Sequence, residues 1–160
     1  MTLAPISFIS DGQVNYQVPP GTPTGRADVK VILADKEVAG GVLQVRSIAP
    51  TLFGTAEIVR VKSDGTQAHE NTLTPIEFGS DRLVLILYGT GFTQVSGLNR
   101  VTLTIGTQSV PVQYAGPQNQ FPGLDQINAE LPFSLAGKGD VTVAVTVESK
   151  PANSLTFTFR

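Results

Sequence analysis

One block of sequence occurs twice in this chain, and it constrains the fold more than any other feature. The first copy is QVNYQVP at residues 13–19, and the second is QINAELP at residues 126–132. Each copy is followed by Gly, a basic residue, any residue, Asp and alternating valines, at residues 25–31 and 137–143. The distance between the two blocks differs by a single residue. The pattern predicts a strand that ends at Pro, a turn and a second strand, used twice.

The composition agrees with an all-β chain. The chain has 160 residues, of which 41% are hydrophobic and only 15% are charged. This is enough apolar material for a core in one large domain or two small ones. Thr, Val, Gly and Pro are plentiful, as expected of short strands joined by turns. Cys is absent, which excludes disulfides, thiolate metal sites and a cysteine nucleophile.

Charge and hydropathy exclude two classes of partner. The net charge is −2 and basic runs are absent, so nothing predicts binding to nucleic acid or to an anionic membrane surface. No stretch approaches the roughly 20 apolar residues of a membrane-spanning helix, so no membrane insertion is expected. Residues 1–5 lack the charged and apolar regions of a signal peptide, and none is predicted.

Alternating apolar residues predict strands along the whole chain. About four strands are expected before Ser47, and the polar run 66–74 is expected to be a loop. The most hydrophobic run, residues 83–88, predicts a buried central strand. The predicted core comprises Leu83, Leu85, Leu87, Leu103, Ile105, Ile127, Leu131, Val143 and Val145.

The strand pattern predicts two units of unequal completeness. Seven strands are expected between Thr55 and Arg160, the number that an immunoglobulin-like β-sandwich requires. We therefore expect an all-β protein in which residues 48–160 form a complete immunoglobulin-like sandwich. Residues 1–47 would form an incomplete repeat of it. This repeat lacks everything equivalent to residues 55–110, which corresponds to about three of the predicted strands.

A family resemblance covers nearly the whole chain. Residues 13–19, the run 112–132, the segment 49–53 and the strand and turn at 85–91 are similar to an uncharacterised C-terminal domain of large secreted bacterial proteins. More loosely, the chain resembles the IPT/TIG immunoglobulin-like modules. The resemblance implies an extracellular or cell-surface, all-β, structural or binding module, and it brings no assigned activity.

The repeated polar residues have two possible roles. Gln13, Asn15, Gln126 and Asn128 recur in register, and each copy ends at a proline, either Pro19 or Pro132. Their amides could bind a sugar or a peptide, or they could satisfy backbone groups of an adjacent loop. Their occurrence in both halves favours the second role, so these six residues are interpreted as a structural repeat motif.

No catalytic or metal site is predicted. His69 is the only histidine, and it is expected in a polar loop without the nucleophile elbow of a hydrolase. The aspartates near turns are explained by Asx hydrogen bonds, with calcium between strand-end loops as the alternative. They are Asp11, Asp28, Asp64, Asp125 and Asp140. No cofactor is predicted, and the chain is not expected to be an enzyme.

The functional expectation is an extracellular structural module. Because a half-sandwich leaves strand edges unpaired, we expect self-association by strand complementation into an oligomer or a surface fibre. Residues 66–74 and 154–159 are the candidate donor segments. The alternative is an adhesion module of a larger secreted protein that binds carbohydrate or protein. For that role Phe121, in the inserted segment 115–122, is the candidate ligand contact.

Overall fold

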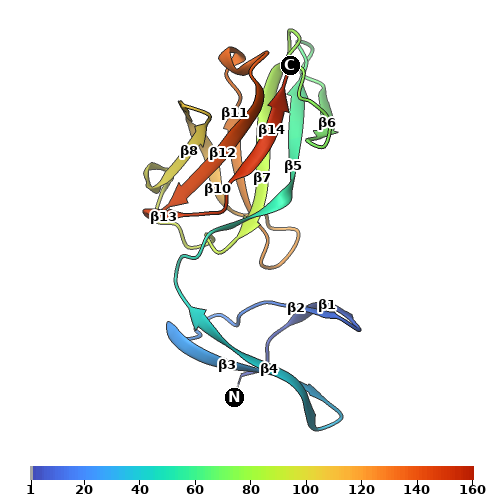
Figure 1. Cartoon of the computed structure of the whole chain (residues 1–160), viewed down its shortest axis with the longest axis vertical. Helices are drawn as coiled ribbons and strands as arrows, with labels where there is room; N and C mark the ends of the chain where they lie inside the picture. Colours follow the sequence, from blue (N-terminus) through green and yellow to red (C-terminus); the bar gives the residue numbers. More distant parts are fainter. Residues whose placement is uncertain (1) are drawn as a thin grey trace. The chain divides into compact units, whose positions relative to one another are not determined.

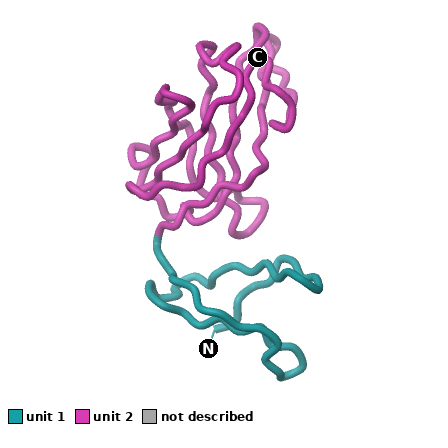
Figure 2. Tube along the Cα trace, viewed as in Figure 1, with its two compact units in different colours: residues 1–47 teal, residues 48–160 magenta. Residues whose placement is uncertain are grey.

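The computed structural model describes residues 2–160 and confirms an all-β protein (Figure 1). Within these residues the regular elements are fourteen β-strands and two short 3₁₀ helices, η1 (Leu98–Arg100) and η2 (Phe133–Leu135). The chain divides into two compact units, residues 1–47 and 48–160, which we call unit 1 and unit 2 (Figure 2).

Unit 1 consists of two antiparallel hairpins. The first joins β1 (Ile6–Ser10) to β2 (Gln13–Tyr16), and the second joins β3 (Gly25–Leu33) to β4 (Lys36–Val45). The turn of the second hairpin is Ala34-Asp35, and both residues have positive φ. Such two-residue turns match the right-handed twist of the flanking strands.

Unit 2 contains two five-stranded antiparallel sheets. The first has the order β10-β11-β7-β5-β6, and in the second β12 pairs with β8, β13 and β14 while β9 pairs with β8. The strands of the first sheet are β5 (Thr51–Val61), β6 (Gln67–Asn71), β7 (Arg82–Thr90), β10 (Val112–Pro117) and β11 (Asp125–Glu130). Those of the second sheet are β8 (Val101–Ile105), β9 (Gln108–Val110), β12 (Gly139–Val147), β13 (Lys150–Pro151) and β14 (Leu155–Phe159).

One apolar core lies between the two sheets of unit 2, as in a β-sandwich. Successive side chains of a strand point to opposite faces, so Leu83, Leu85 and Leu87 of β7 all point inward. All nine core residues predicted from the sequence are buried, which confirms that part of the prediction. β7 lies between β11 and β5 and is therefore a central strand, also as predicted.

Two predictions about unit 2 are wrong. Residues 66–74 contain a strand, β6, which pairs with β5. Its alternation is hidden in the sequence because one of its inward residues, Glu70, is charged. Unit 2 also has ten strands, where the sequence predicts seven between Thr55 and Arg160. Residues 55–110, which have no equivalent in the first repeat, therefore fall within five strands, β5–β9, whereas the sequence predicts about three strands there. The polar β6 and the three-residue β9 escape a search for apolar alternation.

Candidate functional site

An open apolar groove lies between the two hairpins of unit 1. Its volume is about 630 Å³, and both hairpins contribute apolar side chains to it. These include Val14 in the first hairpin, Val18 just after it, and Val29 and Val31 in β3. The alternation of β3 directs the side chains of Asp28 and Lys30 to the face opposite those of Val29 and Val31, although both residues also border the groove. The groove thus has a mainly apolar lining, with charged residues of β3 at its border.

The groove is not covered within unit 1. No residue among 2–47 is buried, whereas unit 2 holds every buried residue of the described chain. Ten of the fifteen exposed large apolar side chains lie in residues 2–47. Five of these ten line the groove, and five lie elsewhere on unit 1. The first set is Leu3, Ile6, Tyr16, Val18 and Ile32, and the second is Phe8, Ile9, Leu33, Val38 and Val42. Apolar surface of this density is typical of a surface that another segment covers.

Each strand of unit 1 also has an unpaired edge. Among residues 2–47, β1 pairs only with β2, and β3 pairs only with β4. The remaining edges carry free N–H and C=O groups that can pair with a further strand. The groove therefore offers both apolar side chains and backbone hydrogen-bonding groups.

The repeated amides make the same contact in both units. Gln13 Nε2 donates to Asn15 Oδ1 at 2.6 Å, and Gln126 Nε2 donates to Asn128 Oδ1 at 2.6 Å. The two prolines also precede the same turn. The N–H of Thr22 donates to the carbonyl of Pro19 at 3.1 Å, and that of Leu135 donates to the carbonyl of Pro132 at 3.0 Å.

The amide contact differs from the predicted one. The sequence interpretation has these side chains bind the backbone of a neighbouring loop, but they bind each other along one face of a strand. Residues i and i+2 lie on the same face of a strand, within the reach of a glutamine side chain. The contact is therefore local, and it occurs in both copies of the Gln-x-Asn pattern.

His69 is not in a loop, which corrects the prediction. It lies on β6, and its Nδ1 is 2.6 Å from Glu57 Oε1 on β5. The hydroxyl of Tyr88, on β7, donates to Glu57 Oε2 at 2.8 Å. Burial and then the Glu57 carboxylate raise the pKa of Tyr88 to about 12. The three side chains form a cluster on the outer face of the sheet, and within residues 2–160 the imidazole contacts no hydroxyl nucleophile.

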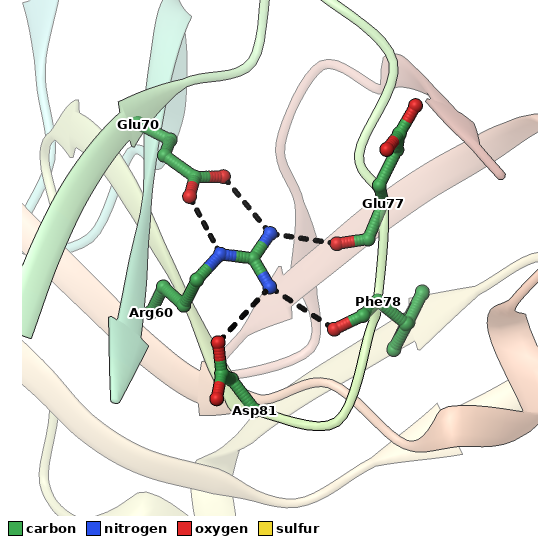
Figure 3. Close-up of polar contacts among 5 residues, drawn as sticks. All are labelled: Arg60, Glu70, Glu77, Phe78 and Asp81. Carbon is green, nitrogen blue, oxygen red and sulfur yellow. Dashed lines mark hydrogen bonds and ion pairs between the residues drawn. The ribbon is translucent and has the colours of Figure 1, made fainter. Parts of the chain in front are cut away.

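Arg60 is held by an extensive set of polar contacts (Figure 3). Its Nε and Nη2 donate to the two carboxylate oxygens of Glu70 at 2.6 and 3.1 Å. Its Nη2 also donates to the carbonyl of Glu77 at 2.7 Å, and its Nη1 donates to the carbonyl of Phe78 at 3.0 Å. Asp81 lies 3.8 Å from Nη1. The hydrogen bond from Arg60 lowers the pKa of Glu70.

This guanidinium serves the fold. It holds the segment between β6 and β7, in which the N–H of Ile76 donates to the carbonyl of Thr158 at 2.8 Å. The N–H of Arg160 in turn donates to the carbonyl of Ile76 at 2.8 Å. The segment therefore covers the outer edge of β14. Because its donors are engaged within the chain, Arg60 is not a binding residue for an anionic ligand.

Asp125 is the only buried charged residue within residues 2–160, and it too has a structural role. Its carboxylate accepts hydrogen bonds from the N–H of Phe92 at 2.8 Å and from Thr93 Oγ1 at 2.5 Å. It thereby fixes the turn after β7. Gly91 in this turn has positive φ, and a Cβ there would collide with the carbonyl oxygen of Ala49. Only glycine fits this close approach.

Phe121 is 63% exposed at the tip of its loop. The side-chain oxygen of Gln118 accepts hydrogen bonds from the N–H groups of Gln120 and Phe121, at 3.0 and 3.2 Å. The N–H of Leu124 donates to the carbonyl of Phe121 at 3.1 Å. These bonds organise the loop and leave the aromatic ring available for contact. Phe133 has a different role, since it packs edge-on against Phe78 with ring centres 5.8 Å apart.

Other kinds of site find no support within residues 2–160. No group of three or more His, Cys, Asp or Glu side chains converges on a point where a metal ion could bind. No helix in that range is long and apolar enough to cross a membrane. Compared with known proteins, the chain matches no family model, no curated protein and no solved structure. The open groove of unit 1 is therefore the main candidate site.

Proposed function

We propose that this chain is a non-catalytic structural module of the cell exterior that joins to a neighbouring polypeptide through unit 1. The observation that carries the proposal is the uncovered apolar groove, which is bordered by unpaired strand edges. The likeness to a domain of secreted bacterial proteins supports the extracellular location, and the absence of Cys is compatible with it. In this role unit 1 is the joining surface and unit 2 is the stable body.

The small size and low burial of unit 1 support the proposal that it joins to a partner. Ordering a chain costs on the order of 1.5 kcal/mol per residue, and burial of apolar surface must offset that cost. Domains below about 40 residues rarely achieve this alone, and unit 1 is only slightly larger. Since none of its described residues is buried, the offset has to come from covering the groove.

The donor segments expected from the sequence are already in use. Residues 66–74 contain β6, which pairs with β5, and residues 154–159 contain β14, which pairs with β12. Phe157 and Phe159 of β14 are buried in the core. Neither segment can leave without opening unit 2. In a solution of this chain alone, where no other partner is present, we therefore expect the uncovered surfaces of unit 1 from two copies to cover each other.

The test is concentration-dependent association of the purified chain, measured by analytical ultracentrifugation. We expect oligomers that Val31→Lys weakens by about tenfold or more, because an ammonium group would enter the apolar groove. Leu73→Lys is the matched control, since Leu73 is an exposed apolar residue of unit 2. A chain that stays monomeric at high concentration would contradict the proposal, most clearly if the amides of residues 6–45 were protected from exchange.

A second candidate function is a binding module, which the exposed and well-supported Phe121 ring favours. Aromatic rings that project from an ordered loop are common contacts for sugars and for peptide side chains. A glycan array and a peptide array probed with the chain would test this candidate. Binding that Phe121→Ala removes while the melting temperature is unchanged would support it, and the absence of any ligand on both arrays would argue against it.

A further inference from the structure

We propose that the groove of unit 1 is an acceptor for the first, five-stranded half of another sandwich of the same kind. The occupant would be a polypeptide patterned like residues 51–110, which form β5–β9 in unit 2. This inference rests on the proposed function and specifies the partner. It follows from a correspondence between unit 1 and the last strands of unit 2.

The first hairpin of unit 1 corresponds to β10 and β11. The same number of residues separates Gln13 from Gln126, Asn15 from Asn128 and Pro19 from Pro132. The Gln-to-Asn hydrogen bond and the turn after Pro recur at these positions with nearly the same distances. β2 therefore has the local geometry of β11.

The second hairpin of unit 1 corresponds to β12 and the strands that follow it. β3 is followed by the turn Ala34-Asp35 and β12 by the turn Glu148-Ser149, and all four of these residues have positive φ. Counted from the repeated Gly-basic-x-Asp block, the turn comes two residues later in unit 2. After each turn the chain returns antiparallel, as β4 in unit 1 and as β13 and then β14 in unit 2. β3 therefore has the position of β12.

This correspondence identifies the missing neighbours. In unit 2 the second edge of β11 pairs with β7, from Asp125 opposite Gly89 to Glu130 opposite Val84. The second edge of β12 pairs with β8, from Val143 opposite Ile105 to Val147 opposite Val101. The matching edges of β2 and β3 are free among residues 2–47. A strand like β7 would therefore lie beside β2, and a strand like β8 beside β3.

The burial of matched side chains shows what these neighbours contribute. Leu131 is 5% exposed, and its N–H donates to the carbonyl of Leu83 on β7 at 2.9 Å, whereas its counterpart Val18 is 42% exposed. Val143 is fully buried, whereas its counterpart Val31 is only partly so. Strands with alternating large apolar residues, as in β7 and β8, would cover these positions.

Other occupants fit less well. A lipid or a small apolar molecule could fill the groove, but it would leave the backbone groups of β2 and β3 without partners. An intact unit 2 cannot supply the strands, because its β7 lies between β11 and β5 and its β8 lies between β12 and β9. The partner must therefore present a five-stranded half whose own second half is missing.

The experiment supplies this half within the same molecule. Residues 48–110 are added before residue 1 through a Gly/Ser linker, so that β9 of the added segment leads into β1. We expect the extended chain to be monomeric, with amide exchange at Val14, Val29 and Val31 slowed by on the order of tenfold or more relative to the original chain. The control carries Leu83→Ser, Leu85→Ser and Leu87→Ser in the added segment only, and we expect it to give no such protection.

The possible results separate the two proposals. If the original chain associates but the added segment leaves unit 1 unprotected or causes aggregation, the acceptor inference is wrong and the proposed function stands. If the original chain does not associate at all, the proposed function fails, whatever the extended chain does. The inference would also be overturned if the Ser-containing control protected the amides of unit 1 as well as the unaltered segment does. A specific β7-like strand would then be unnecessary.

Discussion

Unit 1 and the last five strands of unit 2 contain closely similar hairpins in very different surroundings. In unit 2 those hairpins contribute Ile127, Val143 and Phe159 to the core, and each of these is at most 1% exposed. In unit 1 no residue among 2–47 reaches that level of burial. The difference shows that β-strand formation and burial have separate causes. Local alternation and turns make the hairpins, and neighbouring strands make the core.

The edges of the two units differ in the same way. In unit 2 a segment held by Arg60 covers the outer edge of β14 through Ile76. The corresponding strand of unit 1, β4, pairs only with β3 within residues 2–47. Natural sheets protect their edges because a free edge recruits other strands. Unit 2 meets this requirement at β14, and unit 1 leaves the same position open.

The largest effect is expected from Leu85→Ala. Leu85 is fully buried at the centre of unit 2, and truncation of such a leucine costs roughly 2–5 kcal/mol of unfolding free energy. Chemical denaturation followed by circular dichroism measures it. Leu73→Ala, at a residue that is 85% exposed, should change almost nothing. An unchanged stability of Leu85→Ala would show that β7 is not the central strand of the core.

Arg60→Ala should make unit 2 more like unit 1. The change removes a guanidinium that is 15% exposed, together with its bonds to Glu70 and to two backbone carbonyls. We expect a loss of about 2 kcal/mol and faster amide exchange at Ile76 and Arg160. Arg82→Ala is the control, since its pair with Glu130 is exposed and should contribute less than about 1 kcal/mol. Equal losses in the two variants would contradict the structural role of Arg60.

A matched pair of valines tests the comparison directly. Val143→Ala should lower the unfolding free energy of unit 2 by about 1.5 kcal/mol, since Val143 is fully buried. Val31→Ala, at the corresponding position of unit 1, should cost less than about 0.5 kcal/mol in the dilute chain. In the extended chain that carries a second copy of residues 48–110, the two costs should become similar. Equal costs in the original chain would mean that unit 1 is already covered.

Tyr88 should make unit 2 sensitive to alkali. Its pKa is raised to about 12, so folding favours the protonated phenol. By linkage, the stability that protonated Tyr88 contributes to unit 2 is complete below the unfolded pKa of about 10. This stability is lost as the pH rises through the folded pKa of about 12. Near-ultraviolet titration should reveal a late tyrosinate that Tyr88→Phe removes. A titration in which Tyr88→Phe removes no late component would refute the assignment.

His69→Ala should have the smallest effect. The imidazole is 58% exposed and contacts Glu57 at the surface, so we expect a change of less than about 1 kcal/mol in unfolding free energy. Association and any ligand binding should be unchanged. Loss of a measurable activity in this variant alone, with the fold intact, would reveal a catalytic role for the cluster of His69, Glu57 and Tyr88.

The candidate site was predicted only in outline. An incomplete first unit follows from the two copies of the Gln-x-Asn block, and so does the expectation that its edges are unpaired. The expected donor segments correspond to β6 and β14, which already pair with β5 and β12 inside unit 2. Nothing in a linear sequence reports that Glu70 points inward toward Arg60, since a charged residue in a polar run has the pattern of a loop.

The residues that alternate along each strand, and therefore the leucines and valines of the unit 2 core, can be identified from the sequence. Alternation is a property of a single extended strand, so it can be predicted without knowledge of the neighbouring strands. Which strands become neighbours, and which edges stay free, depends on the three-dimensional fold. Only the register between β5, β6 and β7 brings Glu57, His69 and Tyr88 together, because such contacts depend on pairing between distant segments.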